Sequence, residues 1–208
     1  MSIEGNDASL PHHANFGALL ESMRRLRDDP LAASGANLVV YRGNPAARLM
    51  LIGEGPGAEE DRLGKPFVGR SGQLLDQILR AVGLDPELDV FVTNSVFRRP
   101  PNNRKPTSAE IAWYRPFLLE IVRLIDPGLI VLVGGVAVES ILGERRGITQ
   151  LRGTWFDWQG RQVMPMFHPA YLLRNPSRSA GSPKSLTWRD IQAVRSRLDA
   201  LEPHPPST

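Results

Sequence analysis

Short apolar runs alternate with segments of helical spacing along most of the chain, a pattern typical of α/β proteins. The apolar runs predict core strands at residues 49–52, 90–93 and 129–133, and a strand pair at 154–158 and 161–167. Helical spacing predicts helices at residues 16–27, 71–82, 107–125 and 182–201, and a short helix after Gly135. The chain is long enough to bury a core as one domain.

The pattern fades at both ends of the chain. We expect disordered tails at residues 1–14 and 202–208 around a single domain at 15–201. No apolar run approaches the ~18–20 residues of a membrane span, and no basic segment followed by an apolar core opens the chain. We therefore expect a cytoplasmic protein that is not secreted and has no membrane partner.

Three of the predicted strands end in polar residues. Glu54 follows Gly53, Asn94 ends the second strand, and His168 follows the last. Because carboxyl ends of parallel strands open on one edge of a sheet, we expect an acid, an amide and a histidine to converge on a cleft. The glycine-rich segment 53–57 either lets a ligand approach the backbone closely or is simply a tight turn.

Several of these residues have structural alternatives. Phe67 lies in a predicted loop, where a core plug is favoured over a platform for a stacked base. Asn94 either caps a turn or reads a nucleobase edge through its donor and acceptor. His168 is the only histidine outside the tails, which favours a functional role. Leu172 and Leu173 are either core residues or a wedge that replaces an extruded base.

Composition narrows the chemistry. The absence of cysteine excludes disulfides, thiolate nucleophiles and cysteine-ligated clusters, and only four histidines are present, so we expect no metal site. The net charge is +3. Basic residues gather near the predicted loops at Arg98, Arg99, Arg104, Lys105, Arg174, Arg178 and Lys184. This distribution indicates either a polyanionic partner such as nucleic acid or a scattered, solvated surface charge.

Together these segments resemble the uracil-DNA glycosylase superfamily, and family 4 within it, over residues 48–176. The resemblance rests on Gly-Glu-Gly-Pro-Gly at 53–57, Gly-Lys-Pro-Phe-Val-Gly-Arg-Ser-Gly-Gln-Leu-Leu at 64–75, Thr-Asn-Ser-Val at 93–96, Arg-Pro-Phe-Leu at 115–118 and His-Pro-Ala-Tyr-Leu-Leu-Arg at 168–174. It implies a single α/β domain of three layers, α/β/α, around a mostly parallel four-stranded sheet. It also implies a DNA repair enzyme that flips uracil out and hydrolyses its N-glycosidic bond, leaving an abasic site.

The resemblance also implies a role for each motif residue. The catalytic residues would be Glu54, near the sugar and the attacking water, and His168, facing uracil O2. The substrate-binding residues would be Gly53, Gly55, Phe67 as the stacking ring and Asn94 at the uracil edge. The DNA-binding residues would be Gly57, Ser71, Gly72, Leu172 and Arg174. These roles suit the chemistry, because bond cleavage leaves negative charge on uracil O2 and positive charge on the sugar.

The sequence departs from family 4 in one respect. Members of that family usually hold a [4Fe–4S] cluster on four cysteines, whose positions here fall within residues 31–40, at or beside Arg98, and at Tyr114. We therefore expect a relative without a cluster and without cofactors, in which Trp113 and Tyr114 pack in its place. A related branch traps the abasic product on a histidine in a basic loop. The loop at 98–107 has no histidine, so we expect a monofunctional enzyme without lyase activity or covalent trapping.

The expected partners are uracil-containing DNA, single- or double-stranded, and uracil as product, bound by a monomer that works in the cytoplasm with nucleoid-associated activity. Two alternatives belong to other classes. One is a non-catalytic relative that binds uracil or abasic sites in DNA. The other is an unrelated nucleotide hydrolase, which the lack of a metal-ligand cluster and of a phosphate-binding lysine loop disfavours.

Overall fold

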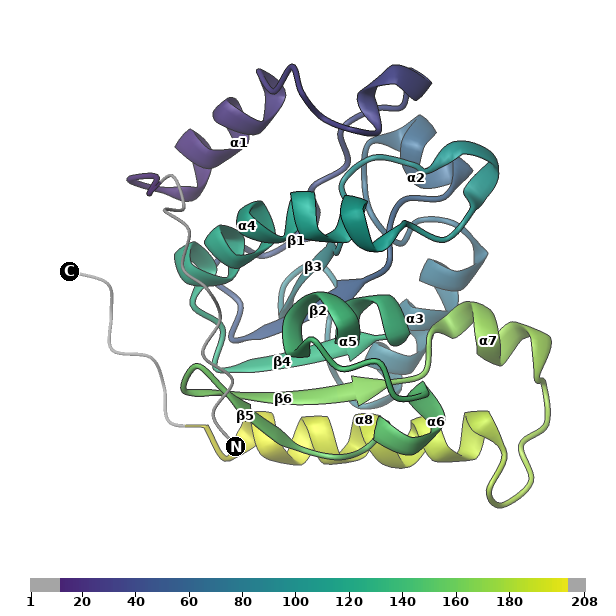
Figure 1. The fold of residues 1–208 in the computed structure, drawn as a ribbon. Coiled ribbons are helices and arrows are strands. Elements are labelled where there is room, and N and C mark those ends of the chain that lie inside the picture. The colour runs from purple at the N-terminus through teal and green to yellow at the C-terminus, as the bar shows by residue number, and fades with distance from the viewer. Residues whose placement is uncertain (1–11, 202–208) are drawn as a thin grey trace.

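A six-stranded sheet forms the middle layer of the protein in a computed structural model that describes residues 12–201 (Figure 1). The strands are β1 (Tyr41–Gly43), β2 (Leu49–Gly53), β3 (Val90–Asn94), β4 (Leu129–Val133), β5 (Phe156–Trp158) and β6 (Arg161–Met166). Their order is β1-β3-β2-β4-β6-β5; the central four are parallel, and β1 and β5 pair antiparallel at the edges.

The predicted α/β class and mostly parallel sheet are confirmed, but the sheet has six strands, not four. Both additional strands are three-residue edge strands. β1 reads Tyr-Arg-Gly, which is too short for strand alternation to be seen. The turn of the predicted β5–β6 pair forms at Gln159 and Gly160, whose φ values of 47° and 75° suit a tight hairpin.

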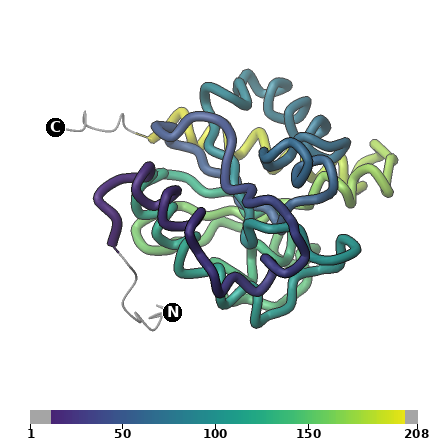
Figure 2. The backbone as a smooth tube through the Cα atoms, turned by 90° about the horizontal axis from the view of Figure 1, so that it is seen from above, coloured from purple at the N-terminus to yellow at the C-terminus, as the bar shows by residue number. Residues whose placement is uncertain are grey.

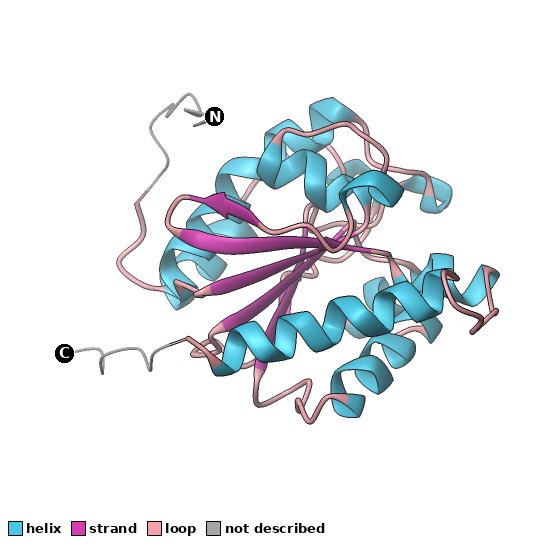
Figure 3. Ribbon diagram, turned by 90° about the horizontal axis from the view of Figure 1, so that it is seen from below, coloured by secondary structure: helices cyan, strands magenta, loops and turns pink. Residues whose placement is uncertain are grey.

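Helices cover both faces of the sheet, giving three layers (Figures 2 and 3). On one face, α1 (Phe16–Arg24), α4 (Ser108–Ile125) and α5 (Gly135–Leu142) share a core with Met50 and Ile52 of β2. On the other, α3 (Arg70–Ala81) and α8 (Pro183–Asp199) share a core with Leu49 and Leu51. Successive residues of β2 therefore face opposite layers, which explains why the whole strand is apolar.

Three short helices occupy segments for which the sequence pattern predicts no helix or strand. They are α2 (Ala58–Leu63), α6 (Ile148–Leu151) and α7 (Pro169–Arg174). None is long enough to show a 3.6-residue period twice. The predicted start of α4 is confirmed, because the Glu110 N–H donates to Thr107 Oγ1 at 3.2 Å and the Thr107 N–H donates to the Glu110 carboxylate at 2.7 Å.

The beginning of the described chain is attached to α4. The His13 N–H donates to the Glu120 carboxylate at 2.7 Å, and Arg123 donates to the His13 carbonyl at 2.9 Å. Residues 12–14 of the expected N-terminal tail are thus in place on the domain, whereas 1–11 and 202–208 lie outside the described residues. Among residues 12–201, no helix is both long and apolar enough to cross a membrane.

A buried ionic network lies where the resemblance predicts cluster cysteines. The Asp29 carboxylate accepts hydrogen bonds from the Tyr114 hydroxyl, from Arg98 Nε at 2.6 Å and from the Leu31 N–H at 2.9 Å. Burial, and then the bond to Asp29, raises the pKa of Tyr114. Iron–sulfur clusters are held by thiolates, and these groups are already bonded to one another, so the residues present do not fit a cluster. The network joins α4 to the segments before β1 and after β3.

We predict that Tyr114→Phe lowers the free energy of unfolding by about 1–3 kcal/mol, because it removes one donor from a buried carboxylate. Tyr41→Phe is the matched control, since the Tyr41 hydroxyl has no hydrogen-bond partner within residues 12–201, and its change should stay within about 0.5 kcal/mol. Urea unfolding of both variants provides the measurement. Equal stability changes in the two would contradict a structural role for the network.

Candidate active site

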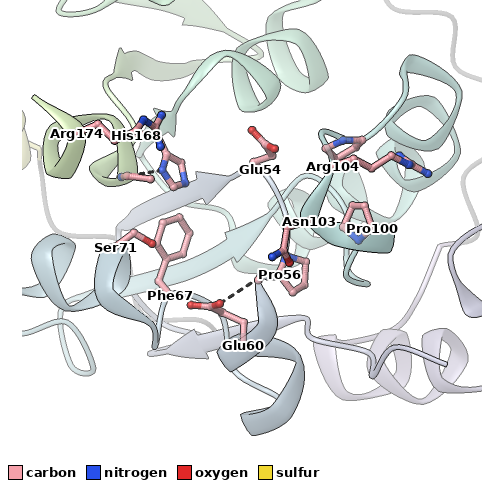
Figure 4. A pocket seen from close by; sticks show the side chains of 14 residues that line it. Glu54, Pro56, Glu60, Phe67, Ser71, Pro100, Asn103, Arg104, His168 and Arg174 are labelled. Atoms are coloured by element: carbon pink, nitrogen blue, oxygen red, sulfur yellow. Dashed lines mark hydrogen bonds between the residues drawn. The ribbon is translucent and has the colours of Figure 1, made fainter. Parts of the chain in front are cut away.

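The carboxyl ends of β2, β3 and β6 bring the predicted polar residues to one edge of the sheet. Gly53 pairs in register with Asn94, and His168 follows β6 by two residues. A cavity of about 570 Å³ opens at this edge (Figure 4). It is lined by Glu54, Gly55, Pro56, Gly57, Glu60, Phe67, Ser71, Pro100, Asn103, Arg104, Pro106, His168, Ala170 and Arg174.

Two glycines of the first motif are required by packing. A Cβ on Gly53 would lie 2.4 Å from the Phe67 ring and 2.6 Å from Asn94 Oδ1. A Cβ on Gly55 would lie 2.6 Å from a methyl group of Val96. Neither separation is sterically possible, so the backbone after β2 can approach its neighbours this closely only with glycine.

Phe67 combines the two roles that the sequence left as alternatives. Its side chain belongs to the core cluster that includes Leu75 and Leu79, and it also lines the cavity. The ring stacks on His168 with centroids 5.7 Å apart and planes 29° apart. One face of the cavity is therefore an aromatic surface backed by the core.

Asn94 is the most unusual polar group near the cavity. It is 1% exposed, and neither Oδ1 nor Nδ2 has a hydrogen-bond partner. Asn94 does not line the cavity itself but lies beside Phe67 around Gly53. Leaving a buried donor or acceptor unsatisfied costs about 1–3 kcal/mol, so such a group marks a place for a polar ligand.

His168 is held as a neutral hydrogen-bond donor. It caps α7, and its Nδ1 accepts the Ala170 N–H at 3.1 Å, which leaves the ring proton on Nε2. Burial, and then the charge of Arg174, lowers the pKa of His168 to about 4, with Glu60 acting in the opposite direction. At neutral pH the imidazole is uncharged and offers one N–H to a ligand.

Glu54 lies in the wall of the cavity between His168 and the loop that carries Asn103 and Arg104 (Figure 4). Burial raises the pKa of Glu54, and the charge of Lys105 partly offsets this effect. A carboxyl whose pKa is moved toward neutrality is suited to accept a proton from water or to stabilise a cation.

Three polar residues of the cavity wall were not predicted to line a site. Glu60 bonds to backbone N–H groups of the first two motifs, and its signal was its place three residues after Gly57, the spacing of a capping box. Asn103 and Arg104 come from the loop after β3, and Arg104 pairs with Glu110 at 2.6 Å. The basic composition of that loop indicated Arg104 as a contact for a polyanion, but nothing in it indicated Asn103.

The proposed DNA contacts divide into three groups. Gly57, Ser71 and Arg174 line the cavity. Gly72 instead lies under the Phe67 backbone, since a Cβ there would be 1.8 Å from its carbonyl oxygen. The assignment of Leu172 is wrong for a side-chain contact, because Leu172 is 1% exposed in the core side of α7, whereas Leu173 is 39% exposed. Leu173 is therefore the member of the pair whose side chain lies at the surface.

The cavity combines an aromatic face, a neutral N–H donor and a carboxyl group, and the unpaired Asn94 amide lies behind its wall, beside Gly53 and Phe67. Such a set suits a flat heterocycle with carbonyl and N–H groups along its edge. Among the described residues, no group of three or more His, Cys, Asp or Glu side chains is placed to hold a metal ion.

Comparison with known proteins agrees with this geometry. A family model described as the uracil DNA glycosylase superfamily matches residues 40–192. A Type-4 uracil-DNA glycosylase of Thermotoga maritima is 42% identical over 178 residues, covering 85% of this chain and 91% of that protein. A Type-4 uracil-DNA glycosylase of Sulfurisphaera tokodaii is 35% identical over 174 residues, covering 76% and 79%.

A further relative is a much longer protein of another kind. A DNA polymerase of Bacillus phage SP01 is 28% identical over 188 residues, which are 90% of this chain but 19% of the polymerase. The family match spans most of the described fold, including the three strand ends that form the cavity. The chain therefore belongs to the uracil DNA glycosylase superfamily.

Proposed function

We propose that this protein is a uracil-DNA glycosylase that takes uracil into the cavity and hydrolyses the bond between the base and its deoxyribose. The observation that carries the proposal is the buried amide of Asn94, which has no partner of its own. Uracil presents a ring N–H beside a carbonyl oxygen, which is the pairing that an amide's acceptor and donor can satisfy. The similarity to Type-4 uracil-DNA glycosylases supports the same substrate.

His168 has the protonation state that the leaving group needs. When the glycosidic bond breaks, its electron pair stays with uracil, and the negative charge spreads to O2. The neutral His168 donates through Nε2–H and would stabilise that charge without first losing a proton. Phe67 would stack on the base and help offset the few kcal/mol that base extrusion costs.

Glu54 is assigned to the sugar side of the reaction. Departure of uracil leaves a cationic sugar at C1′, which the carboxylate would stabilise while it orients a water molecule. The water oxygen bonds to C1′, and its proton passes to Glu54, whose raised pKa favours that transfer. The products are an abasic site and a uracil anion that takes a proton from solvent.

The remaining features concern DNA. Ser71 and Arg174 at the cavity wall and the exposed Leu173 would contact the strand around the flipped nucleotide. Residues 98–107 contain no histidine, so we propose hydrolysis without lyase activity or covalent trapping. We propose that a monomer acts on uracil in single- or double-stranded DNA.

The proposal predicts strand breaks in a labelled oligonucleotide that carries one uracil, after incubation with the protein and alkaline cleavage of abasic sites. An oligonucleotide with thymine at the same position is the control. Breaks no more frequent than without enzyme would overturn the proposal. Tight binding to the uracil strand without turnover would instead identify a non-catalytic binding relative.

Replacing either group that faces the base should slow single-turnover excision at least tenfold. His168→Ala removes the donor to the leaving oxygen, and loss of one such donor typically costs about 10²–10³ in rate. Asn94→Ala removes the amide but should keep the free energy of unfolding within about 1 kcal/mol of wild type, because that amide bonds to nothing. Gln73→Ala, at an exposed position of α3, is the control. Wild-type rates in folded variants would contradict these roles.

The buried neutral histidine predicts a stability difference with pH. In the unfolded chain His168 takes a proton near pH 6.5, but in the folded protein only near pH 4. Stability is therefore lost as the pH falls below 6.5, by about 2 kcal/mol between pH 7.5 and pH 5. Urea unfolding at both pH values should show this loss in wild type and a correspondingly smaller one in His168→Gln. The same loss in both proteins would contradict the assignment.

A further inference from the structure

The backbone at Phe67 is held in a conformation that phenylalanine rarely adopts. Among residues 12–201, the non-glycine residues with positive φ are Phe67, Asn102, Asn103, Asp126 and Gln159. Phe67, with φ of 54°, is the one whose side chain has no polar group to stabilise the turn locally. Such a conformation persists only where its surroundings hold it.

The peptide before Phe67 is held by a buried arginine. Arg42 Nε donates to the Pro66 carbonyl at 2.9 Å. The same guanidinium pairs with Glu87 at 2.7 Å and with Asp76 of α3, and the Arg42 side chain is 4% exposed. With three acceptors around one planar fork, the group that holds the Pro66 carbonyl is itself fixed.

The peptides after Phe67 are held by a buried carboxylate. Glu60 Oε1 accepts the N–H groups of Val68 at 3.0 Å and Gly69 at 2.8 Å. Its other oxygen accepts the Gly57 N–H at 3.1 Å, the bond drawn beside Phe67 in Figure 4. Glu60 thus joins the loop after β2 to the loop that carries the ring.

We infer that Arg42 and Glu60 are positioning residues for base stacking, an inference that rests on the proposed function. By gripping the peptides on both sides of Phe67, they fix the strained turn and so the placement of the ring against Gly53 and His168. Neither acts on the base directly. Their charges hold backbone groups in place, whereas Glu54 is the carboxyl group proposed to act at the sugar.

Two substitutions each weaken the contacts on one side of Phe67. Arg42→Lys keeps the charge, but its donors all lie on one nitrogen and cannot reach three acceptors spread around a planar fork. Glu60→Gln replaces one carboxylate oxygen with an NH2 group, which cannot accept a backbone N–H, so the three N–H groups can no longer all be accepted. We expect each to weaken the Kd for free uracil, measured by ligand-observed NMR, at least fivefold. The Kd for DNA containing a stable abasic-site analogue should stay within twofold, because that ligand has no base to stack. If one variant fails to fold, the other carries the same test.

The matched controls are Arg62→Lys and Glu59→Gln, which make the same changes in an exposed ion pair on α2. Both should bind uracil as wild type does. In a Phe67→Leu background, Arg42→Lys and Glu60→Gln should change the uracil Kd less than twofold further, because the ring through which they act is gone.

Uracil binding within twofold of wild type in folded Arg42→Lys and Glu60→Gln would overturn the inference. So would equal losses for uracil and abasic DNA, or the same loss repeated in the Phe67→Leu background, since these results indicate general loosening. The proposed function is tested separately: it fails if the wild-type protein does not excise uracil. The binding measurements need no turnover, so they test the positioning roles independently of that result.

Discussion

The in-register pairing of β2 with β3 places Gly53 beside Asn94, and the arrangement of the whole site depends on that approach. A Cβ at Gly53 would overlap both the Phe67 ring and the Asn94 amide. Because the strand end is glycine, a buried amide and an aromatic face can lie together at the sheet edge. The amide is left without a partner, a cost that a bound base edge would remove.

Charged side chains in and around the cavity differ in how many partners they have. Glu60 and Arg42 are saturated by backbone and ionic partners and hold the loops in place. Glu54 has no such set of partners among the described residues, and burial raises its pKa. His168 is kept neutral by burial and its tautomer is fixed by Ala170. The site therefore combines a rigid binding surface with two groups whose protonation is tuned.

The pattern of apolar residues was sufficient to predict the regular elements of the sheet. Buried parallel strands are apolar throughout, so β2, β3 and β4 were predictable, and with them the edge where Glu54, Asn94 and His168 gather. Residues that act through a single long-range contact could not be predicted in this way. Nothing near Asp29 indicates that Tyr114, 85 positions away, donates to it. The orientation of Leu172 inward and Leu173 outward depends on how one short helix lies on α3 and α8, which no local period specifies.

In the proposed mode of binding, a uracil ring satisfies the Asn94 amide while His168 faces its O2. A crystal structure of the protein with uracil bound provides the test. We expect uracil stacked on Phe67, with Asn94 Oδ1 and Nδ2 and His168 Nε2 each about 3 Å from a polar atom of the base. Uracil bound elsewhere, or in the cavity with the Asn94 amide still unpaired, would contradict it.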